Sequence, residues 1–110
     1  MWTDSNPEQI RRAAASLGAE SLLQPEVLRN TRIAIYEAGE AVMSSGAPVT
    51  SVSILFRGTM RIYSVSENGK LVTVAIAKPP LMFGDIEFLQ GRDTLHSVVA
   101  ETRAELLCFT

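Results

Sequence analysis

The hydrophobic residues change their spacing along the chain, from a helical period near the N-terminus to strand-length segments after residue 31. The first apolar residues recur three, four and seven positions apart: Ile10, Ala13, Ala14 and Leu17. This spacing is typical of a helix with one apolar stripe. Asn6 can cap such a helix, Pro7 suits its first turn, and Gly18 suits a left-handed residue beyond its end. We therefore expect a helix that begins near Pro7, and a second, shorter helical turn from Pro25.

From Arg32 onward, short β-rich segments are separated by glycines. They cover residues 32–36, 41–43, 52–56, 59–65, 71–77, 81–83, 97–100 and 105–109. Strands of this length and spacing are typical of β-sandwiches and barrels. After Gly84, Asp85 can cap a short helix between the sixth and seventh strands. The pattern predicts a mainly β fold, with an N-terminal helical segment over 1–31 and a β body over 32–110.

The pair Asn68-Gly69 lies between two of these segments and predicts a β-hairpin. Asn-Gly suits a two-residue type I′ turn, because both central residues of that turn have positive φ. The register that follows pairs Ile62 with Ala75, Tyr63 with Val74, Val65 with Val72, and Glu67 with Lys70.

Length, composition and charge restrict the function. A chain of 110 residues with 46% hydrophobic and 20% charged residues can form one domain with a core. The net charge of −2 and the lack of a basic block argue against nucleic-acid binding by these residues. No apolar run approaches the roughly 20 residues of a membrane span, and the N-terminus lacks the pattern of a signal peptide. We expect a cytoplasmic protein without membrane contact.

The chemistry-bearing residues are few. One cysteine, Cys108, and one histidine, His96, are too few for a disulfide, an iron–sulfur cluster or a histidine-rich metal site. Cys108 is expected to be a small buried hydrophobe rather than a reactive thiol. Asp85 and Glu87 would point apart on a helix, and no Ser/His/Asp arrangement accompanies them. The sequence therefore predicts no catalytic residues, no metal and no enzyme activity.

Several short motifs resemble those of the cyclic-nucleotide-binding β-roll, a double-stranded β-helix or jelly roll. They are Tyr36-Glu37-Ala38-Gly39-Glu40, Gly46, Arg57-Gly58, Asn68-Gly69, Phe83-Gly84-Asp85 and Ser97-Val98-Val99-Ala100. With helices before the roll, the chain resembles the N-terminal sensor domain of a bacterial Crp/Fnr-type transcription regulator. The resemblance implies that a dimerisation helix and a helix-turn-helix DNA-binding domain, both absent from these 110 residues, follow the roll in a homodimeric regulator.

The resemblance also locates a ligand pocket. In the family, a carboxylate after the glycine binds the ribose, backbone amides of the short helix face the phosphate, and an arginine pairs with it. Here Gly84 is present, Asp85 replaces the longer Glu, Thr94 stands at the arginine position, and Leu95 follows it. The residues expected to line the pocket are Ile62, Val74, Gly84, Asp85, Thr94 and Leu95.

Thr94 offers a hydroxyl but no positive charge. By analogy with other broken buried charge pairs, the loss of the arginine would cost about 2–5 kcal/mol of phosphate binding. We therefore expect that neither cAMP nor cGMP is the effector, and that no cofactor is bound. Two alternatives stay open: a pocket that holds a nucleotide or another small molecule through Asp85 and Arg92, and a ligand-free dimerisation scaffold whose side chains fill its interior.

Overall fold

The computed structural model describes residues 1–43, 51–65, 68–83 and 96–109. In chain order its elements are β1 (Trp2–Asp4), α1 (Pro7–Ser16), the 3-10 helix η1 (Glu20–Leu22), α2 (Pro25–Arg29), β2 (Thr31–Tyr36), β3 (Ala41–Met43), β4 (Val52–Arg57), β5 (Met60–Val65), β6 (Leu71–Ala77), β7 (Leu81–Phe83), β8 (His96–Ala100) and β9 (Ala104–Phe109). Each strand predicted from the sequence is present, with bounds that differ by at most one residue. None of the helices in these ranges is long and apolar enough to cross a membrane.

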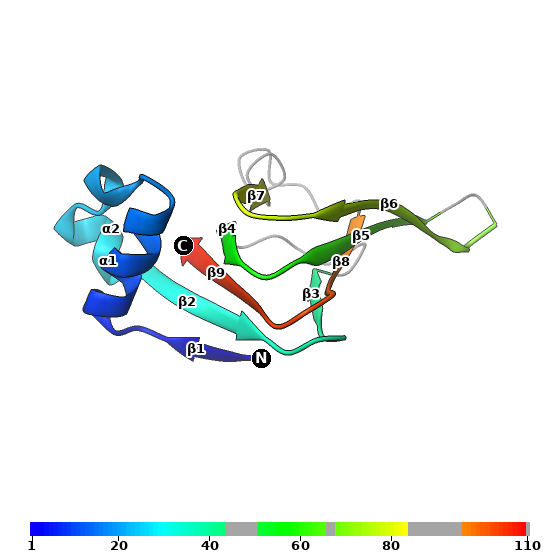
Figure 1. The fold of residues 1–110 in the computed structure, drawn as a ribbon, viewed down its shortest axis with the longest axis horizontal. Coiled ribbons are helices and arrows are strands. Elements are labelled where there is room, and N and C mark those ends of the chain that lie inside the picture. The colour runs from blue at the N-terminus through cyan, green and yellow to red at the C-terminus, as the bar shows by residue number, and fades with distance from the viewer. Residues whose placement is uncertain (44–50, 66–67, 84–95, 110) are drawn as a thin grey trace.

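The strands form two antiparallel sheets. One has the order β1-β2-β9-β4-β7 and the other has the order β3-β8-β5-β6. Figure 1 shows the hairpin of β5 and β6 extending away from the helices, while α1 and α2 lie at the opposite end of the molecule. This arrangement confirms the predicted mainly β roll with N-terminal helices.

Helix α1 covers the outer face of the five-stranded sheet. Its N-terminus is capped as predicted, because Asn6 Oδ1 accepts a hydrogen bond of 2.9 Å from the backbone N–H of Glu8. The buried side chains of its apolar stripe pack on β2 and β9 in one cluster: Ile10, Ala13, Ala14, Ile33, Ile35 and Leu107. After the helix, Gly18 adopts the expected left-handed conformation, with φ of +68°.

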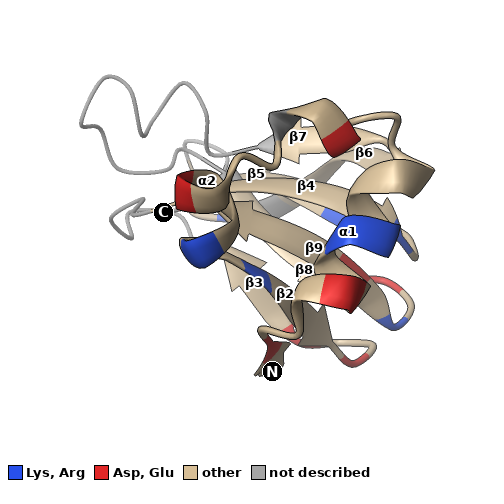
Figure 2. Ribbon diagram, turned by 90° about the vertical axis from the view of Figure 1, so that its left-hand side faces the viewer, with Lys and Arg blue, Asp and Glu red and all other residues tan. Residues whose placement is uncertain are grey.

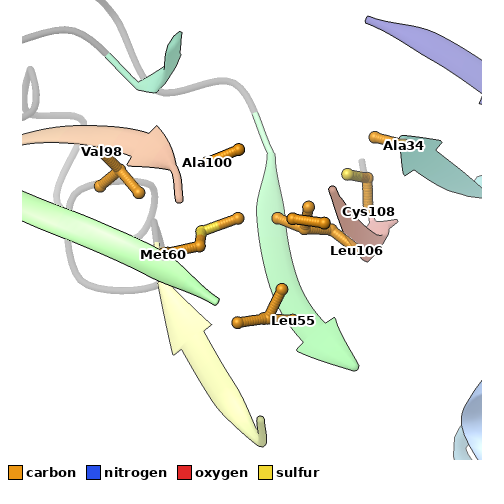
Figure 3. Packing of buried hydrophobic residues seen from close by; sticks show 8 residues of the cluster. Ala34, Leu55, Met60, Val98, Ala100, Leu106 and Cys108 are labelled. Atoms are coloured by element: carbon orange, nitrogen blue, oxygen red, sulfur yellow. The ribbon is translucent and has the colours of Figure 1, made fainter. Parts of the chain in front are cut away.

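A second core cluster lies on the other face of the same sheet. It consists of Ala34, Leu55, Met60, Val98, Ala100, Ala104, Leu106 and Cys108, and Figure 3 shows how these side chains meet. Adjacent residues of β9 therefore serve different clusters: Leu106 belongs to this one and Leu107 packs towards α1. Because both faces of β9 are covered, its sequence is almost continuously apolar.

The hairpin of β5 and β6 differs in part from its prediction. Ile62 pairs with Ala75 as expected, but Tyr63 pairs with Thr73 and Val65 with Leu71. Near the turn the register is therefore shifted by one residue on β6. Gly69 has a φ of +76°, and no non-glycine residue in the described ranges has a positive φ, so Asn68 does not adopt the type I′ conformation. Among the described residues of this turn, only Gly69 is left-handed, whereas the predicted turn needs a left-handed residue at Asn68 as well.

The N-terminal segment contains a strand as well as helices. β1 pairs antiparallel with β2, with Trp2 opposite Ile35 and Asp4 opposite Ile33. This short strand was missed in the sequence, where residues 1–31 were assigned only helices. The segment before the roll therefore extends the five-stranded sheet at its edge.

Candidate functional site

Only two of the residues predicted to line the ligand pocket lie in the described part of the chain: Ile62 and Val74. The other predicted site residues, Gly84, Asp85, Arg92, Thr94 and Leu95, lie outside the described residues, as does the predicted short helix. The geometry available for the site is thus that of the sheet formed by β3, β8, β5 and β6.

Ile62 lies in the middle of this sheet. It pairs with Val98 of β8 on one side and with Ala75 of β6 on the other. Its side chain is half-buried and packs against the core cluster between the sheets. Because side chains two positions apart share a face of a strand, Ser64 lies beyond Ile62 on that face, opposite Val72. In the described part of this face, the Ser64 hydroxyl therefore lies beside apolar side chains.

Val74 lies at an irregularity of the hairpin. The register passes from Ile62 opposite Ala75 to Tyr63 opposite Thr73, so Val74 is the extra residue of a β-bulge. Its side chain is 58% exposed. A bulge twists a strand and re-aims the side chains around it. No local pattern marks this bulge, because the alternation of residues along β6 does not change at Val74.

The outer face of the same sheet has a strong ion pair. Arg61 of β5 donates two hydrogen bonds to Glu101, from Nε to Oε2 at 2.8 Å and from Nη2 to Oε1 at 2.7 Å. These bonds lower the pKa of the Glu101 carboxyl below its usual range and raise the pKa of the Arg61 guanidinium. The pair ties the base of the hairpin to the turn between β8 and β9. Sequence reasoning missed it, because the two residues are 40 positions apart.

Cys108 is 5% exposed, so the prediction of a buried cysteine is confirmed. Its Sγ lies 3.4 Å from Ser53 Oγ inside the roll, and burial raises the pKa of the thiol. A buried thiol with a raised pKa is a poor nucleophile. The described residues hold no group of three or more histidine, cysteine or acidic side chains that could bind a metal ion.

A small cavity of about 140 Å³ lies between α1 and the outer face of the five-stranded sheet. Arg12 and Arg57 line it, but Arg12 is bonded to Glu8 at 3.0 Å and Arg57 to Glu105 at 3.4 Å. Figure 2 shows the same mixing of signs, with acidic and basic segments on both α1 and α2. Because each arginine has its own carboxylate, this cavity offers no excess charge for an ionic ligand.

Comparison with known families matches residues 33–110 to the cyclic nucleotide-binding domain. This range includes every strand from β3 to β9 and most of β2. A global nitrogen regulator from Synechococcus elongatus is 30% identical over 73 residues, which are 64% of this chain and 33% of the relative. The chain thus spans about a third of the length of that relative.

Solved structures share the fold. A transcriptional regulator from Thermotoga maritima is 26% identical with a TM-score of 0.66, over 76% of this chain and 65% of that protein. The regulatory subunit of a cAMP-independent protein kinase A from Trypanosoma brucei, in a mutant form bound to cAMP, has a TM-score of 0.78 at 17% identity. That match covers 94% of this chain and 39% of the kinase subunit, and it concerns the fold alone.

Proposed function

Because the chain belongs to the cyclic nucleotide-binding domain family, we propose that it is the sensor domain of a Crp/Fnr-like transcription regulator whose effector is neither cAMP nor cGMP. The observation that carries this proposal is Thr94, which stands where the family resemblance expects the phosphate-binding arginine. An arginine holds a phosphate through two parallel charge-assisted hydrogen bonds, which a threonine hydroxyl cannot replace.

The size of this effect decides between binding and no binding. A loss of about 2–5 kcal/mol corresponds to a dissociation constant roughly 30- to 4000-fold weaker. Asp85 adds a second unfavourable feature, because its side chain is one methylene shorter than that of the family's Glu and reaches less far towards the ribose. Together these residues remove the charged partner of the phosphate and shorten the reach towards the ribose, so they disfavour a cyclic nucleotide.

The described wall of the roll supports an effector that is less polar than a cyclic nucleotide. Ile62, Ala75 and Val98 lie side by side in the register of the sheet. An apolar wall with few polar groups is typical of sites for small organic molecules. A small-molecule effector of this kind acts on the regulator without any catalytic step in this domain.

The relatives support the regulatory role. The similar proteins from Synechococcus elongatus and Thermotoga maritima are a global nitrogen regulator and a transcriptional regulator. The present chain has a net charge of −2 and spans about a third of the length of the nitrogen regulator, so we place DNA contact and the main dimer contact of the whole protein outside it.

The kinase subunit suggests a variant with which to test the role assigned to Thr94. It is described as cAMP-independent, and its cAMP-bound form carries three substitutions, one of which replaces a threonine by arginine. A substitution of the same kind in the present chain is Thr94→Arg.

Isothermal titration of the chain with cAMP and with cGMP tests the proposal. We expect no binding at micromolar concentrations for the native sequence and a gain of at least tenfold in affinity for Thr94→Arg. Thr94→Lys is the matched control, since it adds charge without the planar fork of arginine. Micromolar binding of cAMP or cGMP by the native chain would contradict the proposal.

The same titration separates the two alternatives. If Asp85 and Arg92 hold an anionic ligand, the native chain binds a nucleotide and Arg92→Ala abolishes that binding. If the roll is a ligand-free scaffold, Thr94→Arg gains nothing, because side chains fill the interior.

A further inference from the structure

Strand β1 lies at the outer edge of the five-stranded sheet, alongside β2 in Figure 1. It is three residues long and pairs Trp2, Thr3 and Asp4 with the middle of β2. Trp2 is 49% exposed, and neither core cluster contains a residue of β1. The strand is therefore held by its ladder and by contacts at its ends rather than by buried side chains.

One side chain of this strand, that of Trp2, contacts the turn between β8 and β9. The guanidinium carbon of Arg103 lies 5.5 Å from the centre of the Trp2 ring, a cation–π distance. Arg103 also lies 3.7 Å from the carboxylate of Glu37, which follows β2. At the chain end, the ammonium group of Met1 donates to Glu40. Trp2 is thus bound to a turn that belongs to neither β1 nor β2.

That turn is itself anchored. Glu101 accepts two hydrogen bonds from Arg61, and its backbone N–H donates to Thr59 O at 2.9 Å. Thr102 Oγ1 accepts from the backbone N–H of Thr59 at 3.1 Å. The position of Arg103 is therefore fixed by bonds to the start of β5 and to the turn before it.

Detachment of β1 would leave the sheet intact. β2 pairs with β9 along its whole length, from Thr31 opposite Phe109 to Tyr36 opposite Ala104. The bonds lost on opening are those of one short ladder and the contacts at its ends. A segment with few buried contacts opens at a lower free energy than the whole domain.

We propose that β1 is a strap that opens and closes over the edge of β2 as a unit of its own, and that Arg103 latches it to the β8–β9 turn. A displacement of this turn carries Arg103 away from Trp2 and releases the strap. Opening bares the backbone groups along the edge of β2, as at any uncovered sheet edge. The strap therefore converts a movement at the end of β8 into exposure of the edge of β2 in the five-stranded sheet.

Amide hydrogen exchange of the full chain, followed by NMR, tests the strap. Along β2 the N–H groups point alternately to β1 and to β9, so one half of them reports on the strap and the other half on the sheet. Arg103→Ala is expected to raise exchange of the β1-facing set about two- to fivefold, the effect of one exposed cation–π contact. Arg103→Lys should raise exchange of this set by less than Arg103→Ala does. Arg12→Ala, which removes an exposed arginine on α1, should leave exchange of this set unchanged.

Trp2 is the only tryptophan in the sequence, so its fluorescence gives a second readout. Acrylamide should quench it more strongly in Arg103→Ala, and also in Glu101→Gln, which loosens the turn without touching Trp2. Trp2→Ala should raise amide exchange of the β1-facing set as much as Arg103→Ala does. The double variant should show no further increase over either single variant. Equal loss of protection in both amide sets would overturn the proposal, as would unchanged exchange in Arg103→Ala or unchanged quenching in Glu101→Gln.

Discussion

Strand β9 and the hairpin strand β6 have similar amounts of apolar sequence, yet they play opposite parts in the molecule. β9 lies between β2 and β4 in the five-stranded sheet, whereas β6 is the edge of the four-stranded sheet. Leu106 of β9 is fully buried, and Ile76 of β6 is 54% exposed. Apolar content alone does not determine burial; the place of a strand in the sheet order does.

The two strands also differ in what surrounds them. β9 is covered by α1 on one face and by the other sheet on the opposite face. Along β6, Val72, Val74 and Ile76 are all more than half exposed, and Lys70 and Lys78 flank the strand. Charged residues beside an apolar edge strand limit unwanted pairing with other chains. The sheet centred on β9 therefore carries most of the described core, whereas the hairpin leaves apolar side chains of β6 exposed among the described residues.

The largest expected effect comes from removing equal side-chain volume at the two places. Leu106→Ala opens a cavity in a closed cluster and should lower the free energy of unfolding by about 4 kcal/mol. Ile76→Ala removes the same number of atoms from an exposed site and should cost less than about 1 kcal/mol. Chemical denaturation of both variants measures the difference. Similar losses of unfolding free energy in the two variants would mean that another part of the chain covers Ile76.

Two glycines extend the comparison to the turns. Gly58 has a φ of +91°, and a Cβ there would lie 2.2 Å from the carbonyl oxygen of Arg103. Gly69, at the hairpin tip, has a φ of +76°, and a Cβ there would meet nothing within 4 Å. The first glycine is thus required by conformation and by close packing, and the second by conformation alone.

Gly58→Ala should therefore cost about 3 kcal/mol, because a backbone clash adds to the strain of a left-handed alanine, and Gly69→Ala only about 1 kcal/mol. Thermal unfolding followed by circular dichroism would rank them. A larger loss at Gly69 would show that the hairpin tip is more constrained than its surroundings indicate.

The same contrast explains what could be predicted from the sequence. The limits of β3, β6 and β7 were predicted to the residue, because local features mark them: glycines, prolines and β-branched runs. The bulge at Val74 and the strand at Trp2 depend on pairing with distant residues. A strand of three residues is also too short to show a period of two.

In the candidate site too, features with a local sequence signal were predicted and features that depend on distant residues were not. The burial of Cys108 followed from its apolar neighbours in β9, and Ile62 was correctly paired with Ala75. The role of Thr94 rests on the position of one residue within a family pattern, so it is a prediction from resemblance. The bond from Arg61 to Glu101 had no local signal, since it needs β5 and the β8–β9 turn to lie side by side.

The smallest expected effect concerns that bond, which joins the hairpin to the rest of the roll. The bonds from Arg61 lower the pKa of Glu101, so the folded state holds this carboxylate ionised at a pH where the unfolded chain has begun to bind a proton. The stabilisation is therefore fully present above the ordinary carboxyl pKa and is lost as the pH falls through the lowered pKa of the folded state.

Glu101→Gln should accordingly lower the melting temperature at neutral pH and have little effect in acid, where the native carboxyl is also uncharged. Both side chains of the pair are partly exposed, so added salt should reduce the difference. Glu8→Gln, which removes the ion pair on the surface of α1, is the matched control for a pair that joins no two elements. A difference between Glu101→Gln and the native chain that stays constant from neutral to acid pH would mean that the glutamate acts through its shape rather than through its charge.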